Sequence, residues 1–215
     1  MLKRILFVTA SFAFLALAGC ETQTTSVTRF TQVSQFPPGK TFAMYAMDEK
    51  KADTLEFKHY TAMVRSRVSA AAGWTSVSPD APHDYKVAFD YAVGKPRTTY
   101  YYPGYGSGLS IGTGHWGHRS FFSTGYAFGP PPDYWETHYD YQLKLDIRAN
   151  AGRGGHTTPD TKVFEAKANA TELASDISYV MPCMLTALFR NFPGTDGQNY
   201  SVTIPYEECT PRPPR

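Results

Sequence analysis

Runs of alternating polar and apolar residues constrain the fold of this chain more than any other feature. Residues 84–93 carry a large apolar side chain at every second position, and residues 139–148 repeat the pattern. Because successive side chains of a strand point to opposite faces, both runs predict strands with one buried and one polar face. Residues 162–171 alternate in the same way, with Phe164 among the inward side chains. The glycine-rich link at 150–159 predicts that the last two strands form a hairpin.

Two other segments have helical periodicity. The first helix is expected to begin at Asp53-Thr54 and to end at Gly73, with Trp74 packing into the core. Its apolar stripe consists of Phe57, Tyr60, Val64, Val68 and Ala71. The second helix is expected from Leu173 to Leu188, with acidic Glu172 and Asp176 in its first turns and Arg190 in its last. Pro182 lies inside it and predicts a kink or a split.

Shorter runs complete the expected domain. Residues 41–47 are apolar on both faces, as in a strand in mid-sheet, and residues 202–206 predict a short final strand. The fold class is therefore α+β, an antiparallel or mixed sheet with two helices packed on one face, because the alternation leaves the other face polar. The single domain is expected to span residues 27–206, followed by a disordered proline- and arginine-rich tail at 207–215.

The segment 97–138 differs in composition from its surroundings. It is rich in glycine and tyrosine, carries few charges and lacks a sustained period. We expect a long, largely irregular loop between two strands, and a loop of this length is functional or disordered. Tyrosines among glycines supply contact area on an adaptable backbone, as in many binding surfaces. The candidate binding residues are Tyr100, Tyr101, Tyr102, Tyr105, Trp116 and Tyr126.

The first twenty residues have the order of a secretory signal. Lys3 and Arg4 precede an apolar run from Ile5 to Leu17, which is shorter than the ~20 residues of a membrane-spanning helix. The run ends in Leu17-Ala18-Gly19-Cys20, which resembles the lipobox of bacterial lipoproteins. The resemblance implies removal of residues 1–19 as a signal peptide and a diacylglycerol on Cys20, with residues 20–26 as a polar tether. The alternative is a plain signal peptide with an incidental cysteine.

These features predict a cell-envelope location. The expected protein is anchored to a membrane by lipid at Cys20 and faces the periplasm. Glu21 follows the cysteine in place of the aspartate that commonly retains enterobacterial lipoproteins in the inner membrane, which favours the outer membrane.

Charge excludes nucleic acid as an expected partner. The net charge of +2 comes from 21 basic and 19 acidic residues, and two of the basic ones, Lys3 and Arg4, lie in the leader. The mature chain is therefore neutral, without the basic patch that nucleic-acid binding requires.

The sequence contains three cysteines, and the compartment expected for the protein is oxidising. With Cys20 lipidated, Cys183 and Cys209 are the remaining pair, and we expect a disulfide between them. The alternative is two free thiols, one buried and one on a mobile tail. A zinc site is not expected, because structural zinc takes four ligands.

The order of these motifs resembles a bacterial lipoprotein family catalogued as domain of unknown function 4136. The resemblance covers about residues 27–194 and depends on short segments. They are Gly39-Lys40-Thr41-Phe42-Ala43, Gly73-Trp74, the strand from Pro79-Asp80 to Val87, Leu143-Lys144-Leu145-Asp146-Ile147, Val163-Phe164-Glu165-Ala166 and Leu188-Phe189-Arg190-Asn191-Phe192-Pro193. Met44-Tyr45 and Phe164 stand where members typically have tryptophan. The family has no established catalytic residues, so the resemblance implies none here.

No motif predicts a catalytic residue, a cofactor or a metal. His115 and His118 could begin a metal site with His138, Asp133 or Glu136, but no neighbouring group orients their rings. Ser110 lies in a Gly-x-Ser-x-Gly match without the strand-to-helix turn of a hydrolase elbow. We therefore expect a non-enzymatic envelope lipoprotein that acts through contacts with another envelope protein. The alternative is a periplasmic carrier of a small ligand or lipid, with a pocket between helices and sheet.

Overall fold

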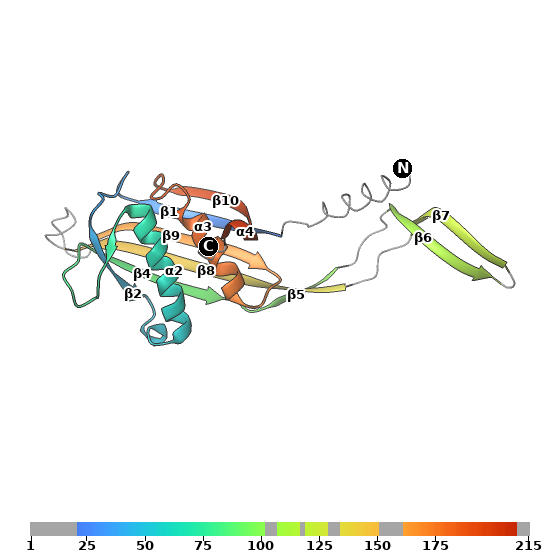
Figure 1. Ribbon diagram of the computed structural model, residues 1–215, viewed down its shortest axis with the longest axis horizontal. Helices are drawn as coiled ribbons and strands as arrows, with labels where there is room; N and C mark the ends of the chain where they lie inside the picture. The colour runs from blue at the N-terminus through green and yellow to red at the C-terminus, as the bar shows by residue number, and fades with distance from the viewer. Residues whose placement is uncertain (1–20, 102–106, 117–118, 129–133, 151–160, 210–215) are drawn as a thin grey trace, which may run out of the picture.

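A mixed sheet with two long helices on one face forms the domain (Figure 1). The computed structural model describes residues 21–101, 107–116, 119–128, 134–150 and 161–209. The elements are β1 Thr22–Thr31, β2 Thr41–Ala46, η2 Glu49–Lys51, α2 Leu55–Ala72, β3 Thr75–Ser76, β4 Tyr85–Val93, β5 Arg97–Tyr101, β6 Ser107–Trp116, β7 Arg119–Phe128, β8 Tyr134–Ala149, β9 Thr161–Glu172, α3 Ile177–Phe189, β10 Gln198–Pro205 and α4 Tyr206–Cys209. The predicted α+β class is confirmed. In this described part, no helix is long and apolar enough to cross a membrane.

The strands follow the order β10-β1-β9-β8-β4-β2-β3, with β5 added to β8. Strands β4 and β8 pair antiparallel from Tyr85↔Ala149 to Val93↔Tyr141, and β8 and β9 pair from Tyr139↔Glu172 onward. The three alternating runs are therefore neighbours, and the hairpin predicted for the last two is confirmed. Among the described strands, the parallel pairs are those of β2 with β3 and with β4.

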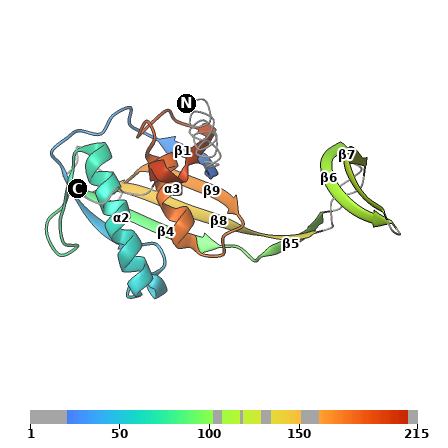
Figure 2. The same cartoon turned by 45° about the vertical axis from the view of Figure 1, so that its right-hand side comes forward.

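Helices α2 and α3 cover the same face of the sheet (Figures 1 and 2). Phe57 of α2 stacks on Phe89 of β4 with ring centroids 4.4 Å apart, and Trp74 stacks on Tyr85 at 4.1 Å. Helix α2 begins at the N-cap Thr54, whose hydroxyl accepts from the Phe57 amide, and ends at Gly73 in the left-handed conformation. Both ends were predicted from the same residues.

The expected tether is wrong, because β1 begins at Thr22. Its inward side chains include Gln23, Thr25 and Arg29, which are fully buried. The Gln23 amide donates to the hydroxyl of Thr25 (3.0 Å) and to the carbonyl of Val180 in α3 (3.3 Å). These hydrogen bonds offset part of the cost of burying polar groups, although Gln23 Oε1 and Arg29 Nε have no hydrogen-bond partner among the described residues. A polar sequence thus forms a strand inside the sheet.

Arg29 connects β1 to the C-terminal end of α3. Its guanidinium donates to the carbonyls of Leu188 (3.2 Å), Arg190 (3.1 Å), Asn191 (3.3 Å) and Pro193 (3.3 Å). These carbonyls lie in the last turn of the helix and in the segment that follows it, where backbone acceptors lack helical partners. Burial lowers the pKa of Arg29 below its ordinary value.

Three further expectations need correction. The expected irregular loop at 97–138 contains strands, because β5 pairs with the start of β8 and β6 pairs with β7 as a separate two-stranded sheet. The second helix begins at Ile177 rather than near Leu173, since β9 continues to Glu172, and it runs through Pro182 without a break. The domain extends past residue 206, because α4 follows β10 and buries Cys209.

Candidate binding surfaces

A two-stranded ribbon extends from one end of the sheet (Figures 1 and 2). It consists of β5 and residues 134–138 of β8, paired from Arg97↔His138 to Tyr101↔Tyr134. Among the described strands, β5 pairs only with β8, and residues 134–138 of β8 pair only with β5. A two-stranded sheet without a packed face has marginal stability in water. Its outer edges are suited to accept a further strand.

The junction between ribbon and sheet is held by Asp140. Its backbone carbonyl accepts from the Gly94 amide at 2.7 Å, and its carboxylate accepts from Arg97 at 2.7 Å and from the Thr171 hydroxyl at 2.8 Å. The hydrogen bonds from Thr171 and Arg97 lower the pKa of Asp140. A Cβ at residue 94 would lie 3.3 Å from Asp140, so glycine suits the position where β4 passes into β5.

An aromatic pair lies on the ribbon. Tyr100 and Trp135 are opposite each other in the register, with ring centroids 4.6 Å apart, and they are 43% and 69% exposed. Such a cross-strand pair stabilises the ribbon and presents a large apolar surface to solvent. The Thr98 and Thr137 hydroxyls form a second cross-strand contact at 3.0 Å.

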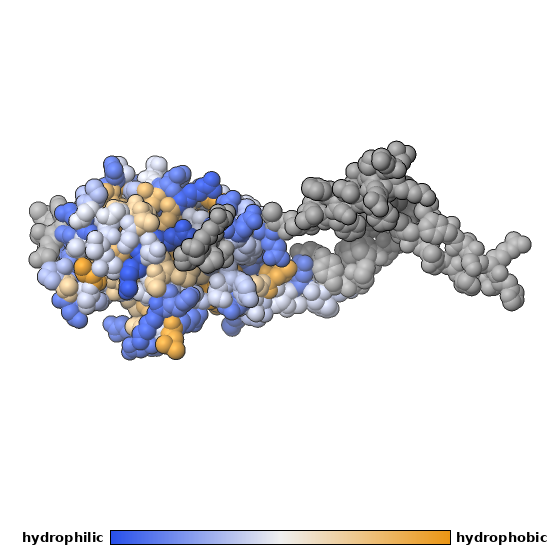
Figure 3. Space-filling model, in the orientation of Figure 1, coloured by the Kyte–Doolittle hydropathy of each residue, from blue (hydrophilic) through white to orange (hydrophobic). Residues whose placement is uncertain are grey.

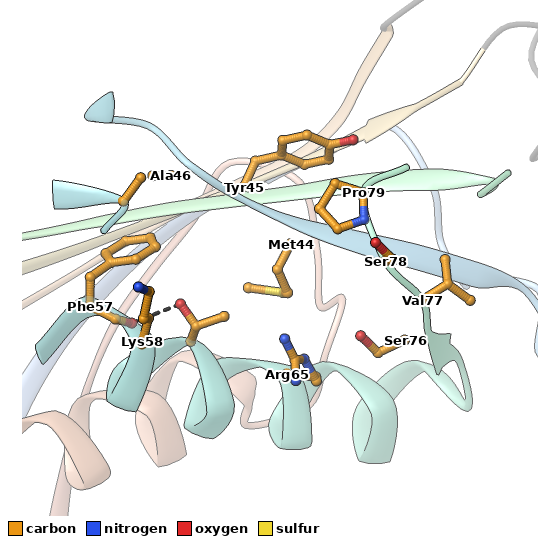
Figure 4. A pocket seen from close by; sticks show the side chains of 12 residues that line it. Met44, Tyr45, Ala46, Phe57, Lys58, Arg65, Ser76, Val77, Ser78 and Pro79 are labelled. Atoms are coloured by element: carbon orange, nitrogen blue, oxygen red, sulfur yellow. Dashed lines mark hydrogen bonds between the residues drawn. The ribbon is translucent and has the colours of Figure 1, made fainter. Parts of the chain in front are cut away.

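A groove of about 760 Å³ lies between α2 and the segment after β3 (Figure 4). Met44 of β2 and Phe57 of α2 give it an apolar floor. Lys58 and Arg65, two helical turns apart on α2, bring positive charge to its rim. Tyr45 points away from α2, and its hydroxyl lies 3.3 Å from Nε2 of His83.

A second groove, of about 490 Å³, lies beside the start of β1. Its lining residues are Glu21, Thr22, Glu172, Leu173, Ala174, Ser178, Tyr179, Pro182 and Tyr206. Burial raises the pKa of Glu172, and it raises the pKa of Tyr206 to about 12. Leu173 and Tyr179 are nevertheless 56% and 66% exposed. The groove therefore combines half-buried polar groups with exposed apolar side chains.

The predicted site residues have different outcomes. Cys183 and Cys209, both buried, lie at disulfide distance with Cα atoms 4.7 Å apart, so the predicted pair is in place. Tyr100 lies on the ribbon. Cys20, Tyr102 and Tyr105 lie outside the described residues, while Tyr101, Trp116 and Tyr126 are placed only as backbone positions of β5, β6 and β7.

Two of the candidate metal ligands, His138 and Glu136, lie together on the ribbon. His115 and Ser110 belong to β6, and His118 and Asp133 lie outside the described residues. His138 Nε2 lies 3.2 Å from the Glu136 carboxylate on the ribbon. Within the described ranges, no group of three histidine, cysteine, aspartate or glutamate side chains could hold a metal.

Sequence reasoning missed Trp135, because it lay within the expected loop. A signal for the ribbon was available in the threonine- and tyrosine-rich run 97–101, which directly follows a proline and has a composition typical of strands. A strand at 97–101 needs a partner, and the partner strand contains Trp135.

Comparisons with known proteins give no family. No family model matches the sequence, and no curated protein matches it. A PDZ domain protein from Parabacteroides distasonis aligns with 91% of this chain at 14% identity and a TM-score of 0.40, and this chain spans 42% of that protein.

PelC from Paraburkholderia phytofirmans, solved as a dodecamer, aligns with 78% of this chain at 10% identity and a TM-score of 0.40, over 96% of PelC. A single-residue variant of the same dodecamer gives a TM-score of 0.41 over 95% of its length. Similarities at this level carry no functional argument.

Proposed function

We propose that this chain is a lipid-anchored envelope protein that acts by binding another envelope protein through the β5–β8 ribbon. The observation that carries the proposal is the Tyr100–Trp135 pair, exposed on a ribbon that no other described strand covers. Exposed aromatic side chains are enriched where proteins contact one another, and open strand edges add backbone hydrogen bonds to a partner strand.

In this proposal the lipid on Cys20 anchors the protein, which faces the periplasm. The membrane proposed is the outer membrane rather than the inner one. Support comes from the lipobox and from Glu21. We also propose membership of the lipoprotein family catalogued as domain of unknown function 4136, on the sequence segments quoted above. The proposal includes no catalytic step and no cofactor.

In-cell chemical crosslinking of Trp135→Ser tests the ribbon contact. Loss of most of the aromatic area should weaken or abolish a crosslinked species of defined mass, while the amount of protein and its membrane fractionation stay unchanged. Phe30→Ser is the matched control. Phe30 is 54% exposed, but it lies near the C-terminal end of β1, at the end of the sheet away from the ribbon. The proposal is contradicted if both variants crosslink like the wild type, or if both lose the species equally.

A second candidate function is carriage of a small ligand or lipid. The groove beside α2 favours it, because an apolar floor of Met44 and Phe57 below Lys58 and Arg65 suits a ligand with an apolar body and a negative group. Native mass spectrometry of gently extracted protein should then show a bound acidic molecule that is lost in Arg65→Ser. Extraction of only unliganded protein would exclude carriage in this groove.

A further inference from the structure

Exposed large apolar side chains gather at one end of the sheet. Eight are exposed among the side chains that the structure describes. One of them, Phe30, lies near the end of β1. The other seven are Met47, Leu55, Val93, Tyr100, Trp135, Leu173 and Tyr179.

Strand directions place five of these seven at one end of the sheet, and Tyr100 and Trp135 lie on the ribbon that extends from that end. Strand β1 begins at Thr22, opposite Pro205 at the end of β10, and the antiparallel β9 ends near it at Glu172. Glu172 pairs with Tyr139 of β8, and Val93 at the end of β4 pairs with the nearby Tyr141. Parallel pairing brings the end of β2, before Met47, to the same side. We call this side the anchor end.

Both helices also begin at the anchor end. Leu55 is the first residue of α2, whose first two turns place Phe57 on Phe89 and Tyr60 against Tyr91 near the end of β4. Leu173 and Tyr179 lie between the end of β9 and the second turn of α3. Figure 3 shows apolar side chains at the surface over the start of α2 and near the point where β5 leaves.

Strand β1 begins at the anchor end, two residues after the predicted lipid attachment site Cys20. Cys20 precedes Thr22 by two residues, and consecutive Cα atoms are about 3.8 Å apart, so the two Cα atoms are within about 8 Å of each other. Gln23 is already fully buried and bonded to Val180. No flexible spacer therefore separates the lipid from the folded sheet.

We propose that the anchor end rests on the bilayer, with Leu55, Leu173 and Tyr179 among the lipid headgroups. This inference depends on the Cys20 anchor of the proposed function. Tyrosine and tryptophan favour the membrane interface because their rings are amphipathic, and buried apolar area adds to the binding of an acyl anchor. The ribbon leaves the same end, so its partner is expected to lie at the level of the bilayer.

The charged residues at the anchor end indicate which lipid headgroups it can contact. The connecting and capping segments at the anchor end are residues 21, 47–56, 94–96, 172–176 and 206–208. Their acidic residues are Glu21, Asp48, Glu49, Asp53, Glu56, Glu172, Asp176, Glu207 and Glu208, and their basic residues are Lys50, Lys51 and Lys95. Anionic lipids attract basic segments and repel acidic ones. Apolar insertion into a zwitterionic surface is therefore the expected contact.

Photocrosslinking to lipid tests the contact. The full lipidated protein carries a photoreactive amino acid at Leu173 or at Phe30 and is reconstituted into vesicles of pure phosphatidylcholine. These positions are matched in exposure, at 56% and 54%, but lie at opposite ends of the sheet. Lipid adducts, measured by mass spectrometry, should be several-fold more abundant from position 173. Phosphatidylglycerol added to the vesicles should leave that yield unchanged or lower it.

Equal yields from both positions, or a yield that rises with phosphatidylglycerol, would overturn the proposal. Intact mass of the same samples shows whether Cys20 carries lipid, so a missing anchor is recognised separately. The crosslinking of Trp135→Ser to protein reports on the partner contact independently, because it does not involve position 173.

Discussion

Gly194 lies directly against the guanidinium of Arg29. A Cβ at residue 194 would stand 2.3 Å from Nη1 and 2.8 Å from Cδ of Arg29, and the φ of Gly194 is +78°. Only glycine meets both demands without strain. The glycine thereby allows a buried arginine to satisfy the carbonyls at the end of α3 and to tie the helix to β1.

Gly194→Ala should therefore destabilise the fold strongly. We expect a loss of about 2–3 kcal/mol in the free energy of unfolding, measured by urea denaturation, from steric overlap with Arg29 plus backbone strain. Gly197→Ala is the matched control, because Gly197 also has a positive φ, +67°, but a Cβ there meets nothing within 4 Å. It should cost only about 1 kcal/mol. Equal losses in the two variants would refute close packing around Arg29.

The Cys183–Cys209 pair should contribute measurably to stability. The cysteines are 26 residues apart and join α3 to the short helix that ends the domain. Replacing both with alanine should cost about 3 kcal/mol, on the basis of the chain entropy of a loop of that length. The thermal midpoint of the wild type should fall on reduction, while that of the double variant should not respond. A response of both proteins to the reductant would show that the effect is not due to this disulfide.

Glu172 should make stability depend on pH. Burial raises its pKa in the folded protein above the ordinary 4.5, so folding favours the protonated carboxyl. Its contribution is most favourable below pH 4.5 and is lost as the pH rises through the folded-state pKa. Glu172→Gln should consequently be more stable than the wild type at neutral pH, with a difference that shrinks below pH 4.5. Urea midpoints across this range provide the measurement, and a difference that is independent of pH would contradict burial of the charge.

The ribbon should keep its pairing when the segment beyond it is removed. Replacing residues 103–130 with a short Gly/Ser link retains β5 and the start of β8, which pair through five residue pairs from Arg97↔His138 to Tyr101↔Tyr134. We expect the domain to fold with a change of only about 1–2 kcal/mol, because closure entropy varies slowly with loop length. Near-ultraviolet circular dichroism tests whether the shortened domain is folded, and urea denaturation measures its free energy of unfolding. Loss of cooperative unfolding would place residues 103–130 in the core.

The predictable parts of the fold are those in which apolar burial imposes a period. Strands β4, β8 and β9 alternate because one face packs under α2 and α3, and α2 is framed by Thr54 and Gly73. Their pairing and the fold class followed from that pattern.

Elements whose burial is polar or absent could not be predicted in this way. The start of β1 lies in the segment 20–26, which was expected to be a tether because it is small and polar, and the hydrogen bond from Gln23 to α3 accounts for its place in the sheet. Among the ribbon side chains that the structure describes, none belongs to the buried core, so no alternation identified the ribbon, and Trp135 was missed with it. Cys183 and Cys209 were predicted from chemistry alone, because two thiols remained in an oxidising compartment.

The claim that the ribbon binds a protein is tested most directly by photocrosslinking at Trp135 in living cells. A photoreactive amino acid at this position should give one protein adduct of defined mass, in membrane fractions, and the same group at Phe30 should not. The adduct should also persist when Leu173→Ser weakens contact with lipid. Absence of any protein adduct at Trp135, or the same adducts from Trp135 and Phe30, would contradict a binding role for the ribbon.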